Sequence, residues 1–281
     1  MSSYKTILVH VDDSAHVAAR IGVAATIAIA QEAHLIGAAL TGVSRFIEEA
    51  VASNPYDPAI TPYLDTLRQR ASACLDKFDE QVRRIGVHSF ERRLIDDEAR
   101  GGIILQARHS DLVVVGQSDP EQPTRAVDAD LPEYVAISSG TPVLIIPFAD
   151  VIPNVGKHVL IAWNGSREAR RAVQDAMPLL RAALRVEVVV FNPAERPSPQ
   201  GGEQCTGIIL TLQRHGIDAK LKTENVKHSA IGSTLLSLAA ASSADLLVMG
   251  CYGHTRFREM LLGGVTRDVL ASITVPVFMA H

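Results

Sequence analysis

The sequence has 281 residues, enough for about two average domains that each bury a hydrophobic core. Hydrophobic residues make up 47% of the chain and charged residues 21%, a composition that is typical of globular proteins and excludes a disordered or collagen-like one. The formal net charge of −4 argues against a nucleic-acid-binding protein, because such proteins usually carry a strongly basic surface.

No segment of the sequence predicts a membrane or secretory location. The opening residues, MSSYKTILVHVDDS, lack the charged leader and apolar core of a secretory signal. The longest apolar run, residues 21–30, is about half the length that a membrane helix needs. The cysteines Cys74, Cys205 and Cys251 are widely separated and form no CxxC pair. We therefore expect a cytoplasmic protein with no membrane partner and no metal site.

In the first half of the chain, short apolar runs alternate with longer helical patterns. The runs predict strands at residues 6–11, 35–40, 90–95, 112–115 and 143–146. Residues 54–58, with the sequence NPYDP, predict a loop before a long helix.

The second half alternates in the same way. Its predicted strands are residues 159–163, 186–191, 219–223, 246–249 and 275–279, and its predicted helices are residues 167–183, 203–215, 231–242 and 266–271. Residues 246–249 are apolar at every position, which is typical of a strand covered on both faces of a parallel sheet. This alternation predicts an α/β protein in which each half is a doubly wound, five-stranded parallel sheet.

The two halves also repeat each other in order. Residues 5–14 match 157–166, residues 111–116 match 245–250, and residues 142–146 match 276–280. The first half carries extra residues between Thr41 and Arg84, and a seam with two prolines and a glycine falls at residues 147–156. We therefore predict two homologous domains, residues 1–150 and 151–281.

Ligands of such sheets bind beyond the carboxyl ends of strands, so the residues after the first and fourth strands are the candidates. In the second half these are Asn164-Gly165-Ser166 and residues 250–266, GCYGHTRFREMLLGGVT. The glycines of residues 250–266 are spaced G-x2-G-x9-G-G, and they lie between a predicted buried strand and a predicted helix near Thr266. Glycine lets a backbone approach an anion, and a helix start supplies N–H donors. By spacing alone, simple turns are equally consistent with this pattern.

Residues 250–266 as a whole point to one protein family more specifically than the glycine spacing does. Together with the preceding ADLLVMG and the final VPVF, this segment resembles the signature of the universal stress protein family, whose nucleotide-binding members carry G-x2-G-x9-G-(S/T). The resemblance covers essentially the whole chain as a tandem form, and it implies an adenine nucleotide alpha hydrolase-like fold that binds ATP or a related adenine nucleotide, with or without Mg²⁺. It implies nucleotide contacts at Asn164, Met249, Gly250, Gly253, Gly263, Gly264, Val265 and Thr266, and it makes His254 and Arg256 further candidates for the phosphates.

Two positions depart from the family pattern. Asn164 replaces the usual aspartate, although its amide oxygen can still accept a hydrogen bond from an adenine amino group. Gly264 replaces the usual serine or threonine, and Thr266 offers a hydroxyl two residues later. Both departures predict weaker binding.

The first half lacks the glycine pattern. Aligned without gaps, it carries Asp119 for Gly253, Ala129 for Gly263, Asp130 for Gly264 and Pro132 for Thr266. A carboxylate about 5 Å from a phosphate charge costs about 3 kcal/mol at an effective dielectric of about 20. We predict one nucleotide site per chain, in the second half. Asp12 matches the family's acidic position and stays open as a contact for another small molecule, while His10 is interpreted as a core histidine.

Three functions remain open at this point. The first is a stress-response protein that acts through nucleotide-dependent conformation or interaction. The second is a slow ATP hydrolase, for which Glu259 is the carboxylate nearest to the glycines. The third is an interaction scaffold without a nucleotide. The P-loop, GxSxG, HExxH and GxGxxG motifs are absent. The resemblance also implies pseudo-twofold pairing of the two domains and a homodimer.

Overall fold

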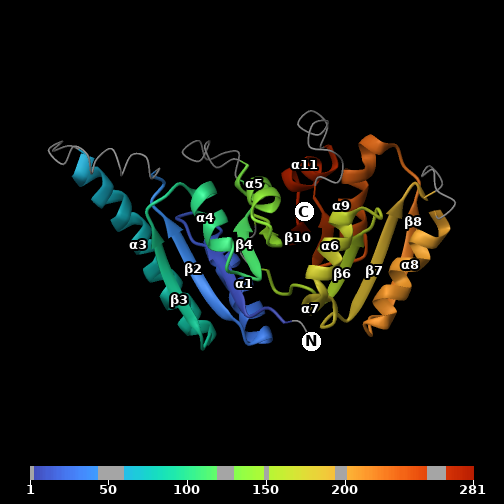
Figure 1. Cartoon of the computed structure of the whole chain (residues 1–281), viewed down its shortest axis with the longest axis horizontal. Coiled ribbons are helices and arrows are strands. Elements are labelled where there is room, and N and C mark those ends of the chain that lie inside the picture. Colours follow the sequence, from blue (N-terminus) through green and yellow to red (C-terminus); the bar gives the residue numbers. More distant parts are fainter. Residues whose placement is uncertain (1–2, 44–59, 119–129, 149–151, 194–200, 252–263) are drawn as a thin grey trace. The chain divides into compact units, whose positions relative to one another are not determined.

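The structure is a computed structural model that describes residues 3–43, 60–118, 130–148, 152–193, 201–251 and 264–281 (Figure 1). The chain divides into two compact units. The first consists of Ser3–Val143 and Phe148–Ile152, and the second of Pro153–His281 with Leu144–Pro147. That these units are two homologous domains stays a prediction.

The chain up to residue 146 alternates strands and helices. Its elements are β1 (Thr6–His10), α1 (Val17–Gln31), β2 (His34–Leu40), α3 (Ile60–Ile85), β3 (Phe90–Ile95), α4 (Ala99–Ala107), β4 (Leu112–Gly116), α5 (Leu131–Ser138) and β5 (Val143–Ile146). The order in the sheet is β3-β2-β1-β4, with β5 next to β4, and the β1–β2, β2–β3 and β1–β4 pairs are parallel. The strand order reverses at β1, so right-handed crossovers place α1 and α3 on one face and α4 and α5 on the other.

The second unit repeats this arrangement. Its elements are β6 (His158–Ala162), α6 (Arg167–Asp175), α7 (Met177–Leu180), β7 (Arg185–Phe191), α8 (Gly201–Arg214), β8 (Ala219–Glu224), the 3-10 helix η3 (His228–Ala230), α9 (Ile231–Ala241), β9 (Leu246–Gly250), α11 (Gly264–Ala271) and β10 (Val277–Ala280). The order is β10-β9-β6-β7-β8 with parallel pairs, and it reverses at β6. The predicted doubly wound α/β class is confirmed, and the ten strands lie within two residues of their predicted ends.

One predicted helix is wrong in its extent. Residues 167–183 form α6, a break at Ala176, and the short helix α7, which ends at Leu180. Pro178 explains the break, because proline has no N–H to donate to the carbonyl four residues earlier and its ring crowds that carbonyl. The last predicted helix also begins two residues earlier than expected, at Gly264.

An aspartate at the start of the fourth strand of each unit fixes the start of the first strand. Asp111 Oδ2 accepts hydrogen bonds from the backbone N–H groups of Lys5 (2.7 Å) and Thr6 (2.9 Å). Asp245 Oδ1 does the same for Gly156 (2.9 Å) and His158 (3.0 Å). The repeated Asp-Leu block therefore has a structural role in setting the register of the two central strands.

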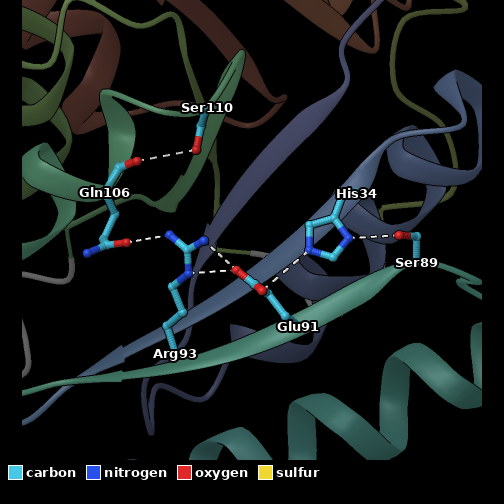
Figure 2. A network of polar contacts seen from close by, with 6 residues as sticks. All are labelled: His34, Ser89, Glu91, Arg93, Gln106 and Ser110. Atoms are coloured by element: carbon cyan, nitrogen blue, oxygen red, sulfur yellow. Dashed lines mark hydrogen bonds and ion pairs between the residues drawn. The ribbon is translucent and has the colours of Figure 1, made fainter.

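The end strand β3 of the first unit is held by a network of polar side chains (Figure 2). Glu91 binds Arg93, and the Nη1 of Arg93 donates to the Gln106 side chain on α4 at 2.6 Å. On its other side Glu91 lies 3.8 Å from Nε2 of His34. The other ring nitrogen of His34, Nδ1, is hydrogen-bonded to the hydroxyl of Ser89. Charged side chains on an end strand oppose pairing with strands of other molecules.

Candidate functional site

In the second unit the switch of strand order lies between β6 and β9, so the candidate crevice is at the carboxyl ends of these strands. Asn164, two residues after β6, is exposed, and its Oδ1 accepts the N–H of Ser166 at 3.0 Å. The Oγ of Ser166 in turn accepts the N–H of Ala169 at 3.1 Å and caps α6. This tight turn carries the chain from strand to helix and leaves Asn164 at the surface of the crevice.

Gly250 ends β9 directly beneath the first turn of α6. A Cβ at this position would clash with the backbone nitrogen of Ala169 and lie 2.6 Å from the carbonyl carbon of Glu168. Only glycine allows this contact between helix and strand. The sequence pattern indicated an approach to an anion here, whereas the structure also supplies a packing reason for the glycine. Met249 is buried at 5% exposure and lies in a strand that is paired on both sides, with β6 and β10.

The first turn of α11 forms the other described part of the site. Gly264 is exposed, Val265 is half-buried, and Thr266 is buried. A Cβ at Gly264 would meet no described atom closer than Oδ2 of Asp268, at 3.9 Å. Among the described residues, none crowds the backbone at Gly264. The other predicted contacts, Gly253, His254, Arg256 and Gly263, lie outside the described residues, as does Glu259.

Sequence reasoning missed Glu168. Its side chain is 4% exposed, it lies against Gly250, and Nε of Arg167 donates to its carboxylate at 2.5 Å. Burial raises the pKa of Glu168, but hydrogen bonds from Arg167, from its own backbone N–H and from Ser166 lower it more, so that it lies below its ordinary value. An ionised carboxylate therefore borders the crevice. The only sequence signal for Glu168 is that an acidic residue in the first turn of a helix, after a serine cap, is favourable for the helix dipole.

The corresponding crevice of the first unit has a different composition. Asp12 Oδ1 accepts hydrogen bonds from Arg20 Nη2 (2.8 Å) and from the Ser14 N–H (2.9 Å), and the Ser14 hydroxyl also binds it. Burial raises the pKa of Asp12, yet the charges of Arg20 and of His10 and the Ser14 hydrogen bonds hold it well below its usual range. His10 is buried, with Nδ1 3.8 Å from Asp12 Oδ2, as expected of a core histidine.

In the first half, other residues stand at the positions aligned with the glycine segment of the second half, and the structure describes two of them. Asp130 is exposed, directly precedes α5 and pairs with Arg100. Pro132 lies in the first turn of α5, where proline is tolerated. Asp119 and Ala129 lie outside the described residues.

Among the described residues, no group of three or more His, Cys, Asp or Glu side chains is arranged to hold a metal ion. None of the described helices is long and apolar enough to cross a membrane. Cys74 and Cys251 are buried.

Comparison with known proteins agrees with this architecture. Residues 156–281 match the model of the universal stress protein family. Universal stress protein Slr1230 from Synechocystis sp. is 28% identical over 120 residues, which cover 42% of this chain and 40% of that protein, so the match spans about two fifths of the relative's length.

Solved structures extend the likeness in fold to nearly the whole chain. The match to a universal stress protein from Archaeoglobus fulgidus covers 98% of this chain and 95% of that protein's chain. The TM-score is 0.72 and the sequence identity is 16%. Another universal stress protein, solved in complex with cAMP, covers 53% of this chain and is itself covered completely, at 24% identity. Its TM-score of 0.38 is too low for its ligand to be transferred to this chain.

The strand order and the alternation of strands and helices define the class as doubly wound α/β proteins, a fold that the universal stress protein from Archaeoglobus fulgidus shares. Within that class, residues 156–281 are similar to the universal stress protein family, and the expected resemblance is confirmed over these residues.

Proposed function

We propose that the chain binds ATP or a related adenine nucleotide in its second unit and acts in the stress response through nucleotide-dependent conformation or interaction. The observation that supports this most is the bare backbone at the start of α11. Gly264 is exposed and has room beside it, at the end of a glycine segment that begins at Gly250. N–H groups in the first turn of a helix are good donors to phosphate, and the helix dipole adds to the attraction.

Asn164 is the proposed contact for the adenine. Its Oδ1 already accepts the Ser166 N–H, but an amide oxygen has two lone pairs and can accept a second hydrogen bond from an amino group. Asn164 is neutral, so this contact is weaker than the charged hydrogen bond an aspartate would make. Discrimination among nucleotides would therefore depend more on backbone contacts than on this side chain.

Glu168 bears on the form of the nucleotide. An ionised carboxylate at the border of the crevice disfavours a free polyphosphate and favours one whose charge is partly neutralised by a divalent cation. Mg²⁺ is usually held by one or two carboxylates together with substrate phosphates. We therefore propose that the second unit prefers Mg²⁺-ATP to free ATP.

The chain has one tryptophan, Trp163, which lies between β6 and Asn164 and reports on the site directly. Titration of the full chain with ATP, with and without Mg²⁺, should change its fluorescence in a saturable way. Mass spectrometry of the natively purified protein should show a retained adenine nucleotide. No fluorescence change at millimolar ATP, with no retained nucleotide, would favour the interaction scaffold instead.

A slow ATP hydrolase is the second candidate, and Glu168 is the observation that favours it. Its ionised carboxylate lies against Gly250 at the end of β9, whereas Glu259 lies outside the described residues. Phosphate release that is lost in Glu168→Gln while ATP binding is kept would support hydrolysis. Release that is lost only in Glu259→Gln would assign the role to that residue.

The remaining expectations from the family are also proposals. We propose that the first unit is a diverged second copy of the domain, that the two copies pair about a pseudo-twofold axis, and that the chain forms a homodimer in the cytoplasm. Light scattering during size-exclusion chromatography of the full chain tests the homodimer, since a mass near 30.2 kDa would indicate a monomer.

A further inference from the structure

A buried arginine lies between the carboxyl ends of β1 and β4 in the first unit. Arg20 projects from α1 and is 4% exposed. Its Nη2 donates to Asp12, beyond the end of β1, at 2.8 Å. On the other side it lies against Gly116, the last residue of β4, because a Cβ built there would clash with its Nη1 and lie 3.6 Å from its Cζ. The guanidinium therefore spans the two strand ends at which the order of the sheet reverses.

The arginine is firmly held in this position. Asp12 is ionised, and Ser14 binds the same carboxylate through its N–H and its hydroxyl. Asp12 is half-buried and Arg20 is buried, so separating the two would leave the guanidinium without its ion pair inside the protein, which is destabilising. A weakly binding ligand cannot displace Arg20 at that cost.

The second unit has no arginine at the aligned position. The alignment that pairs Ser14 with Ser166 pairs Asp12 with Asn164 and Arg20 with Ala172. Ala172 is fully buried, and the place that Arg20 takes beside Gly116 is taken beside Gly250 by backbone atoms of Glu168 and Ala169, with no arginine side chain between them. The ion pair of the first unit is thus replaced by a neutral amide and a methyl group.

We propose that Arg20 determines which unit binds the nucleotide: its guanidinium, paired with Asp12, occupies the first unit's crevice and excludes the nucleoside. This inference rests on the proposed function for the class of ligand. It adds a second barrier to the one predicted from the sequence, because Asp130 opposes phosphates whereas Arg20 opposes the nucleoside itself.

The test is to give the first unit the residues of the second, in the variant Asp12→Asn/Arg20→Ala of the full chain. Both charges are removed together, so no unpaired charge is buried, and thermal unfolding confirms that the variant is folded. Adenosine is the probe, because it lacks the phosphates that Asp130 would repel. We expect equilibrium dialysis to show one more adenosine bound per chain than in the unchanged protein, while the number of ATP molecules bound stays the same.

The matched control is Asp13→Asn/Arg70→Ala, which removes an exposed ion pair of 2.9 Å in the same unit and should add no site. A folded Asp12→Asn/Arg20→Ala variant with no additional adenosine would overturn the proposal. So would loss in that variant of a ligand that the unchanged first unit binds, since Arg20 would then be a ligand contact. Failure of the proposed function would give a different result: the unchanged chain would not bind ATP, whatever the variant does with adenosine.

Discussion

Substitutions at Gly264 test whether the start of α11 holds a phosphate. Gly264→Asp places in the second unit the residue that Asp130 provides in the first. The fold should tolerate it, because Gly264 is exposed and the nearest described atom to a new Cβ is 3.9 Å away. An acidic residue in the first helical turn is also favourable for the helix dipole.

The expected loss of affinity follows from the charge alone. Two like charges about 5 Å apart repel by about 3 kcal/mol at an effective dielectric of about 20, and solvent at this exposed position lowers that value toward about 1 kcal/mol. ATP should therefore bind about tenfold to a hundredfold more weakly to Gly264→Asp. Calorimetric titration of the full chain at low and high salt measures the effect, which should shrink as salt rises.

Two control variants separate charge from shape at this position. Gly264→Asn has nearly the same size as the aspartate variant without the charge, so its affinity should stay close to that of the unchanged chain. Gly264→Ser restores the hydroxyl of the family pattern and should bind ATP at least as tightly. Equal affinities of the aspartate and asparagine variants would refute a phosphate at the start of α11.

Two further predictions concern stability. Gly250→Ala should lower the free energy of unfolding by about 1–3 kcal/mol, because its Cβ clashes with backbone of α6. The control Gly207→Ala, whose Cβ would meet no described atom within 4 Å, should be neutral or stabilising in urea denaturation. Burial raises the pKa of Glu187, but Lys222 and Arg185 lower it overall, so its stabilisation holds above about pH 4.5 and is lost on further acidification. An unchanged acid dependence of stability in Glu187→Gln would contradict this.

Much of the fold could be predicted from the sequence because strand and helix patterns are local. The continuous apolar residues 112–115 and 246–249 indicated buried central strands, and both form them. The repeat of residues 5–14 at 157–166 predicted a second strand–turn–helix, which is confirmed. The break at Ala176 was missed although Pro178 signalled it, because the apolar pattern continues through it.

The candidate site was only partly predictable. The sequence placed Asn164, Gly250 and Gly264 at strand and helix ends of the second unit, and their roles in binding remain predictions. It gave no indication that Glu168 is buried against Gly250, or that Arg20 lies between Asp12 and Gly116.

The sequence by itself determined the class of fold, the repeat of the two halves and the unequal glycine content of their loops. Only the tertiary structure decided which charges are buried and which crevice contains an arginine. The physical reason is that periodicity and turn residues act over a few neighbouring positions, whereas the burial and pairing of Arg20 or Glu168 depend on how a helix packs across strands that are distant in sequence.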